Sequence, residues 1–112
     1  MALTSKPIIP GSLLTDAAAT YYTCPASTRC VITKLVFCNA ATAAQTVTVY
    51  RVPSGGTAGT TNIVVLTHAL AQSETWECYA MEGHTLNPGD FISALADNNA
   101  RVTITGSGIE IT

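Results

Sequence analysis

Side chains that could carry out a reaction are few in this chain and lie far apart. The two histidines, His68 and His84, do not occur in an H-x-x-x-H or H-E-x-x-H pattern, so the spacing of a zinc site is missing. His84 could serve as a base for Cys78, but nothing around the pair supplies the environment that activates a catalytic cysteine. We therefore expect no metal, no cofactor and no nucleophilic site.

The carboxylates are equally dispersed. Glycoside hydrolysis needs two carboxylates that face one bond, whereas Glu74 and Glu77 would point to opposite faces of a shared strand. Asp90 follows Pro88-Gly89 and is expected to close a turn. A calcium loop needs clustered oxygen ligands, and the only faint match, Asp97-Asn98-Asn99, is explained equally well as a hairpin turn. The sequence predicts a protein that is not an enzyme.

Cysteines and aromatic residues allow two further interpretations. The cysteines lack C-x-x-C spacing and are interpreted as reduced, half-buried apolar residues, although a disulfide from Cys24 or Cys30 to Cys78 stays open. The aromatic side chains could line a sugar-binding face, but we favour packing in a core or interface. The cysteines are Cys24, Cys30, Cys38 and Cys78, and the aromatic residues considered are Tyr21, Tyr22, Tyr50, Trp76 and Tyr79.

Composition limits the class of protein. The 112 residues suit one domain, and 47% are hydrophobic. Only 11% are charged, against about 25% in an ordinary soluble domain, so most of the surface must be neutral. Neutral surfaces of this kind are either inert or buried against partners, so we favour permanent assembly with other chains and keep a soluble monomer as the alternative. The sequence contains no run of basic residues that would indicate nucleic-acid binding, and no apolar stretch is long enough to cross a membrane. The first residues lack the apolar core of a signal peptide, so we expect synthesis in the cytoplasm.

The elements that would position these side chains are strands. Val, Ile and Thr dominate, and short apolar runs alternate with Gly, Pro and Asn clusters. Residues 28–39 have two apolar faces and are predicted to form a central strand that is covered on both sides. Gly106-Ser107-Gly108 separates two apolar phases and predicts a bulge or bend. We predict an all-β, two-sheet antiparallel β-sandwich, jelly-roll-like, with an immunoglobulin-like order as the alternative. The core candidates of this sandwich are Val47, Val49, Ile63, Val65, Phe91, Leu95, Val102 and Ile104.

Two prolines divide the predicted chain into an arm and a domain. Proline lacks an amide donor, so residues 1–11 are predicted to form an extended N-terminal arm and residues 12–112 the single sandwich domain. A frayed terminus is the alternative for the residues up to Pro10. The arm is our candidate for contacting a capsid or another partner. Its deletion would then weaken binding and leave the domain folded. The candidate contact residues are Lys6, Pro7, Ile8, Ile9 and Pro10.

Several segments in order resemble small virion proteins of tailed bacteriophages. They are YTCPASTR at residues 22–29, VIT at 31–33, FCN at 37–39, VTVYRVPSGG at 47–56, LNPGD at 86–90 and ITGSGIEI at 104–111. The resemblance implies a β-sandwich with an architectural role and without catalytic residues. Such proteins are typically capsid cement (decoration) proteins or small parts of the tail or head–tail region.

The resemblance gives a specific expectation of function. The chain would be a cement protein that bridges capsomers on the outer surface of a phage head, made in the host cytoplasm. Its partners would be the major capsid protein and further copies of itself, as a dimer or trimer. One alternative is a tail, collar or fibre-associated virion protein, and another is a glycan-binding β-sandwich module.

Overall fold

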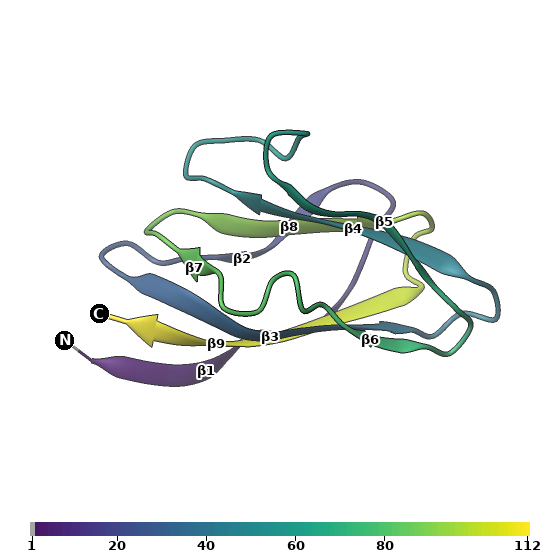
Figure 1. Ribbon diagram of the computed structural model, residues 1–112, viewed down its shortest axis with the longest axis horizontal. Helices are drawn as coiled ribbons and strands as arrows, with labels where there is room; N and C mark the ends of the chain where they lie inside the picture. Colours follow the sequence, from purple (N-terminus) through teal and green to yellow (C-terminus); the bar gives the residue numbers. More distant parts are fainter. Residues whose placement is uncertain (1) are drawn as a thin grey trace.

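The computed structural model describes residues 2–112, and this part of the chain contains nine strands and no helix (Figure 1). No helix long and apolar enough to cross a membrane therefore occurs among these residues. The strands are β1 (Leu3–Leu13), β2 (Ala19–Thr23), β3 (Arg29–Asn39), β4 (Gln45–Val52), β5 (Ile63–Leu70), β6 (Thr75–Glu77), β7 (Thr85–Leu86), β8 (Phe91–Ala96) and β9 (Val102–Ile111).

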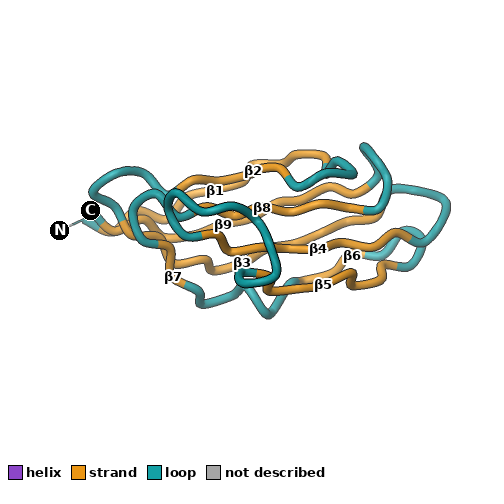
Figure 2. Tube along the Cα trace, turned by 90° about the horizontal axis from the view of Figure 1, so that it is seen from above, coloured by secondary structure: helices purple, strands orange, loops and turns teal. Residues whose placement is uncertain are grey.

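The strands form two antiparallel sheets with jelly-roll topology. The first sheet has the order β1-β9-β3-β6, with β7 also on β3, and the second has the order β2-β8-β4-β5. Because β6 and β7 pair with different parts of β3, they act as one interrupted strand, which leaves the eight-strand double-sheet arrangement of a jelly roll. Seen from above, β1 and β2 lie along one long side and β5 and β6 along the other (Figure 2). The predicted sandwich is confirmed, and the immunoglobulin-like order is not found.

Alternation along β3 builds much of the core. Cys30 and Ile32 face inward, a register shift follows, and Leu35 and Phe37 again face inward, all fully buried. Burying such side chains contributes roughly 1.5–3 kcal/mol each, which makes this the main favourable term for folding. The position of β3 between two strands agrees with the sequence prediction. Its outer face differs from the prediction, because Val31, Val36 and Cys38 are only partly covered there.

Buried and more exposed residues alternate along β9 from Val102 to Gly108, which corrects the bulge or bend predicted at residues 106–108. Gly106 and Gly108 stay in phase with the core, so Ile109 faces outward. A Cβ atom at Gly108 would lie 2.9 Å from the carbonyl oxygen of Val31 and 3.0 Å from Cys30 Sγ. The neighbouring strands carry the irregularities instead, between Lys6 and Ile9 in β1 and between Ile32 and Lys34 in β3.

Strand β1 contains the segment predicted as a separate arm. The backbone is extended as expected, but it pairs with β9 from Leu3 to Leu13, so a boundary between residues 11 and 12 falls inside a strand. Ile8 and Ile9 are 6% and 2% exposed and belong to the core. Hydrophobic burial thus outweighs the effect of two prolines, which an edge strand tolerates because one side needs no amide donors. Met1, part of the predicted arm, lies outside the described residues.

Truncation of a β1 core residue tests whether this segment is part of the domain. We expect Ile9→Ala to lower the free energy of unfolding by about 2–4 kcal/mol, because it removes buried methyl groups and leaves a cavity. The matched control Leu3→Ala, on the same strand but 66% exposed, should change it by less than about 0.5 kcal/mol. Urea denaturation followed by circular dichroism measures both, and equal small effects would show that residues 3–13 are not part of the folded unit.

Candidate functional site

The predicted contact residues, Lys6 to Pro10, lie together on β1 but face different ways. Ile8 and Ile9 are buried in the core and cannot contact a partner. Pro7 and Pro10 are exposed and help to line a shallow depression of about 180 Å³ on the first sheet. Lys6 Nζ lies 3.4 Å from Glu110 Oε1. Only the two prolines and part of Lys6 are available as the contact site that the sequence suggested.

A polar cluster at one end of the sandwich joins the two sheets. The hydroxyl of Tyr22, on β2, donates a hydrogen bond of 2.5 Å to Glu110 Oε2 on β9. The Glu110 side chain is 12% exposed, so its carboxylate is largely shielded from water. Tyr22 and Lys6 are the partners that compensate for the lost hydration. Burial, and then the Glu110 hydrogen bond, raise the pKa of Tyr22. A phenol held protonated in this way supports the fold and is not an activated nucleophile.

The thiols are protected by the core. Cys24, Cys30 and Cys78 are buried, Cys38 is partly exposed, and all four are free, so the disulfide left open by the sequence is not formed. Burial raises the pKa of Cys24 to about 11, and burial also raises the pKa of Cys30 and of Cys78. Catalytic cysteines need the opposite shift, because the thiolate is the nucleophile. The sequence interpretation as apolar residues holds for three of them, which are fully rather than half buried.

The histidines have separate surroundings. His68 on β5 stacks on Trp76 of β6 with ring centroids 3.8 Å apart, and Trp76 stacks on Phe37 at 5.8 Å. This stack closes the side of the sandwich between β5 and β6. His84 lies just before β7 and lines a different feature, a groove between the sheets, so the structure does not bring the two histidines together.

The aromatic residues do not form a common platform. Tyr21, Tyr22 and Trp76 pack against the core, while Tyr79 is 70% exposed between β6 and β7. Tyr50 lies opposite Ser93 on the outer face of the second sheet. The five aromatic residues considered in the sequence therefore lie in different places in the described chain and do not form one shared surface.

The outer face of the second sheet is uncharged. Its four strands contain one charged residue, Arg51, and the position of Arg51 opposite the buried Ile92 directs it inward. The outer face of the first sheet, by contrast, carries Arg29 and the Lys34–Glu77 ion pair. Three residues on this side, Thr48, Val52 and Ser93, are buried. We call the accessible part of the uncharged surface the neutral face; its residues are Thr20, Thr23, Thr46, Tyr50, Ala69, Phe91 and Leu95.

The register explains which core predictions fail. Val47, Val49, Val102 and Ile104 are fully buried as the sequence indicated. Phe91 and Leu95 were expected beside them but belong to the neutral face, because β8 turns Ile92, Ala94 and Ala96 inward. Ile63 and Val65 on β5 are only partly buried. A one-residue change of phase moves every side chain of a strand to the other face.

Comparison with known proteins supports the fold. No known protein family matches the sequence, and no curated protein does either. Among solved structures, the chain is similar to one described as Bacillus endospore appendages that form a family of disulfide-linked pili. The TM-score is 0.56 at 18% identity, over 98% of this chain and 88% of that chain.

Two virus structures are also similar. The infectious bursal disease virus Gx strain and the T13 particle of that virus each give a TM-score of 0.51, at 13% and 9% identity. Each match covers 97% of this chain, which spans 30% of the length of the virus chains. At these identities the similarity establishes the fold alone: the chain is a jelly-roll sandwich of the kind found in a pilus and in virus particles.

Thiol accessibility tests the arrangement of the cysteines. In the native protein at pH 8 we expect Ellman's reagent to react rapidly with Cys38 alone, because the other three thiols are buried and protonated. All four should react in 6 M guanidinium chloride. The variant Cys38→Ser should lose the rapid native reaction and keep three thiols in denaturant. Rapid native reaction of that variant would contradict the burial described here.

The raised thiol pKa values also predict a pH dependence of stability. The unfolded chain releases thiol protons above about pH 8.5, whereas folded Cys24 retains its proton up to about pH 11. The contribution of the Cys24 thiol to the free energy of unfolding is therefore fully present below about pH 8.5 and is lost as the pH rises toward about 11. The urea midpoint should fall across this range, and less steeply in Cys24→Ala, while Cys30 and Cys78 act in the same direction. Identical slopes in the two proteins would contradict this origin.

Proposed function

We propose that this chain is a structural subunit of an assembled particle, and specifically a capsid cement protein of a tailed phage. The observation that carries the proposal is the neutral face, an uncharged surface that spans all four strands of the second sheet. Similarity of fold to pilus and virus-particle proteins, and the sequence resemblance to small phage virion proteins, point in the same direction.

The neutral face has the chemistry of a permanent contact. Charged groups lose hydration when an interface forms, and interface cores are accordingly depleted of charge. Here the accessible hydroxyl groups belong to threonines, and Tyr50, Phe91 and Leu95 on the same face are all partly exposed. The threonines are Thr20, Thr23 and Thr46. A partner that covers this face would bury apolar surface without leaving a charged side chain of this face buried and unpaired.

In this role the molecule would act mechanically. A capsid shell under internal pressure fails where capsomers meet, and a sandwich that binds across such a seam adds buried area that must be separated. The major capsid protein would be the main partner, and a dimer or trimer of the chain on the outer surface of the head would place several neutral faces over one seam. No step of this proposal requires a catalytic group.

Strand β1 changes how the role can be tested. A free arm would be tested by deletion of residues 2–10. In this structure the deletion would remove Ile8 and Ile9 from the core and unpair one edge of β9. We therefore assign the contact to the neutral face, and the exposed Pro7 and Pro10 could contribute only at the margin of the first sheet.

One alternative rests on a specific observation. The match to the pilus structure covers 88% of that chain, so a whole pilus subunit has the size and fold of this protein. A tail, collar or fibre location in a virion is equally compatible with the neutral face. Copy number separates these roles, because a cement protein should approach the abundance of the major capsid protein, and a pilus subunit would form filaments without a shell.

Charges placed on the neutral face test the proposal. We expect Tyr50→Lys/Leu95→Lys to reduce the bound copies per particle at least about ten-fold, because each buried unpaired ammonium opposes association by several kcal/mol. The measurement is electron microscopy with quantitative mass spectrometry of particles incubated with the purified variant.

The matched control places the same charges on the opposite sheet. Thr103→Lys/Thr105→Lys lies on the outer face of β9 and should leave binding within about two-fold of wild type. Circular dichroism and thermal denaturation establish that both variants fold. Equal binding of the neutral-face variant and the wild type, or abundance far below that of the shell protein, would refute the cement role.

A further inference from the structure

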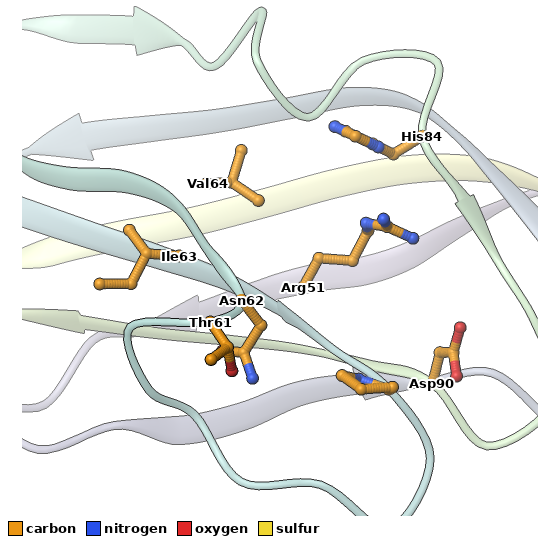
Figure 3. Close-up of a pocket in the computed structure, with 8 residues that line it drawn as sticks. Arg51, Thr61, Asn62, Ile63, Val64, His84 and Asp90 are labelled. Carbon is orange, nitrogen blue, oxygen red and sulfur yellow. The ribbon is translucent and has the colours of Figure 1, made fainter.

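A groove opens between the two sheets on the side opposite β1 and β2. It has a volume of about 470 Å³ and forms where the edge strand of the first sheet is interrupted between β6 and β7 (Figure 3). This volume falls in the range of ligand sites, roughly 300–1,000 Å³. Its lining comes from β4, the β4–β5 loop, β5 and the segments on either side of β7: Arg51, Pro53, Thr61, Asn62, Ile63, Val64, His84 and Asp90.

Arg51 places a positive charge in this groove. Its side chain extends toward β7, where one guanidinium nitrogen, Nη1, donates a hydrogen bond of 3.1 Å to the carbonyl oxygen of Thr85 (Figure 3). Among residues 2–112, no carboxylate lies within 4.0 Å of it, since the ion pairs found there are Lys6–Glu110 and Lys34–Glu77. The Thr85 bond fixes the direction of the planar group and leaves its other donors unused.

Asp90 lines the same groove but does not neutralise Arg51. Its two carboxylate oxygens accept hydrogen bonds from the backbone amides of Ser54 and Asn87, at 2.9 and 3.0 Å. These bonds hold the turn at residues 87–90, where Gly89 has φ of +87° and the amide of Asp90 donates to the carbonyl of Asn87. Asp90 is thus the turn-closing residue that the sequence predicted, and it is committed to the turn.

His84 completes the polar end of the groove. Its backbone is fixed, because its amide donates to Met81 and its carbonyl accepts from Ile32, which places the imidazole on the same side as the Arg51 guanidinium (Figure 3). No hydrogen bond joins the imidazole to the part of the chain that the structure describes. Pro53, Ile63 and Val64 supply apolar wall next to these two groups.

We propose that the groove binds a carboxylate whose attached hydrocarbon rests on the apolar wall. A guanidinium with a fixed orientation pairs with a carboxylate through two parallel hydrogen bonds, and an imidazole N–H can add a third. One arginine beside one aspartate fits a monoanion better than a phosphate dianion. The carboxylate belongs either to a free small acid or to a glutamate or aspartate of another protein chain. This inference is independent of the proposed assembly role.

The test is a ¹⁵N NMR titration of the full chain with sodium butyrate, against sodium chloride at equal ionic strength. We expect saturable shifts of the Arg51 Nε–H signal and of the His84 and Thr85 amides with butyrate alone. Arg51→Gln should weaken butyrate binding at least about ten-fold. The matched control Arg101→Gln, which removes an exposed arginine outside the groove, should leave binding within about two-fold.

A second Arg51 variant and a peptide ligand complete the test. If Arg51→Gln does not fold, Arg51→Lys retains the charge, loses the planar fork and should weaken binding at least about three-fold. The peptide Ac-Ala-Glu-Ala-NH₂ separates the sources: tighter binding than butyrate indicates a protein carboxylate, and weaker binding a free acid. The proposal is overturned if butyrate gives no saturable shift, if Arg51 variants bind unchanged, or if inorganic phosphate binds more tightly than butyrate.

Discussion

The close packing of β9 between β1 and β3 is the constraint on which the rest of the structure depends. Gly106 and Gly108 present no side chains to the core, so Ile8, Ile9 and Leu35 fill the space above them. That arrangement draws the N-terminal strand into the first sheet despite its prolines. It also keeps β9 in phase to its end, which turns Glu110 inward to Tyr22 and links the two sheets.

Most of the fold follows from local sequence patterns. Alternating apolar residues, the Asn-Pro-Gly-Asp turn and the branched residues of β3 and β4 predict the strands and the sandwich class. The predictions that are wrong concern residues whose position depends on which strand lies next to them. The pattern in residues 1–11 does not reveal that Ile8 and Ile9 pack over glycines from the other end of the chain, and the pairing register of β8, not its composition, decides that Phe91 and Leu95 face outward.

The neutral face, the groove and the Tyr22–Glu110 pair could likewise be predicted from the sequence only in part. The low charge content predicts that a neutral surface exists, and the sheet register determines where it lies. Arg51, His84 and Asp90 come from three separate elements, and Tyr22 and Glu110 are 88 residues apart in sequence. No short motif marks either group, because each depends on a long-range contact between strands that the jelly-roll order brings together.

The two ends of the described chain meet at one end of the sandwich (Figure 1). The amide of Ala2 donates to the carbonyl of Thr112 at 3.0 Å, and the amide of Thr112 donates to the carbonyl of Ala2 at 2.9 Å. Ends that lie this close can be joined by a short linker, with new ends opened in a surface loop. The glycine-rich loop between β4 and β5 is such a place. The domain is thus suited to circular permutation, and a tag fused to either original end would emerge at the same pole, from the first sheet, which does not carry the neutral face.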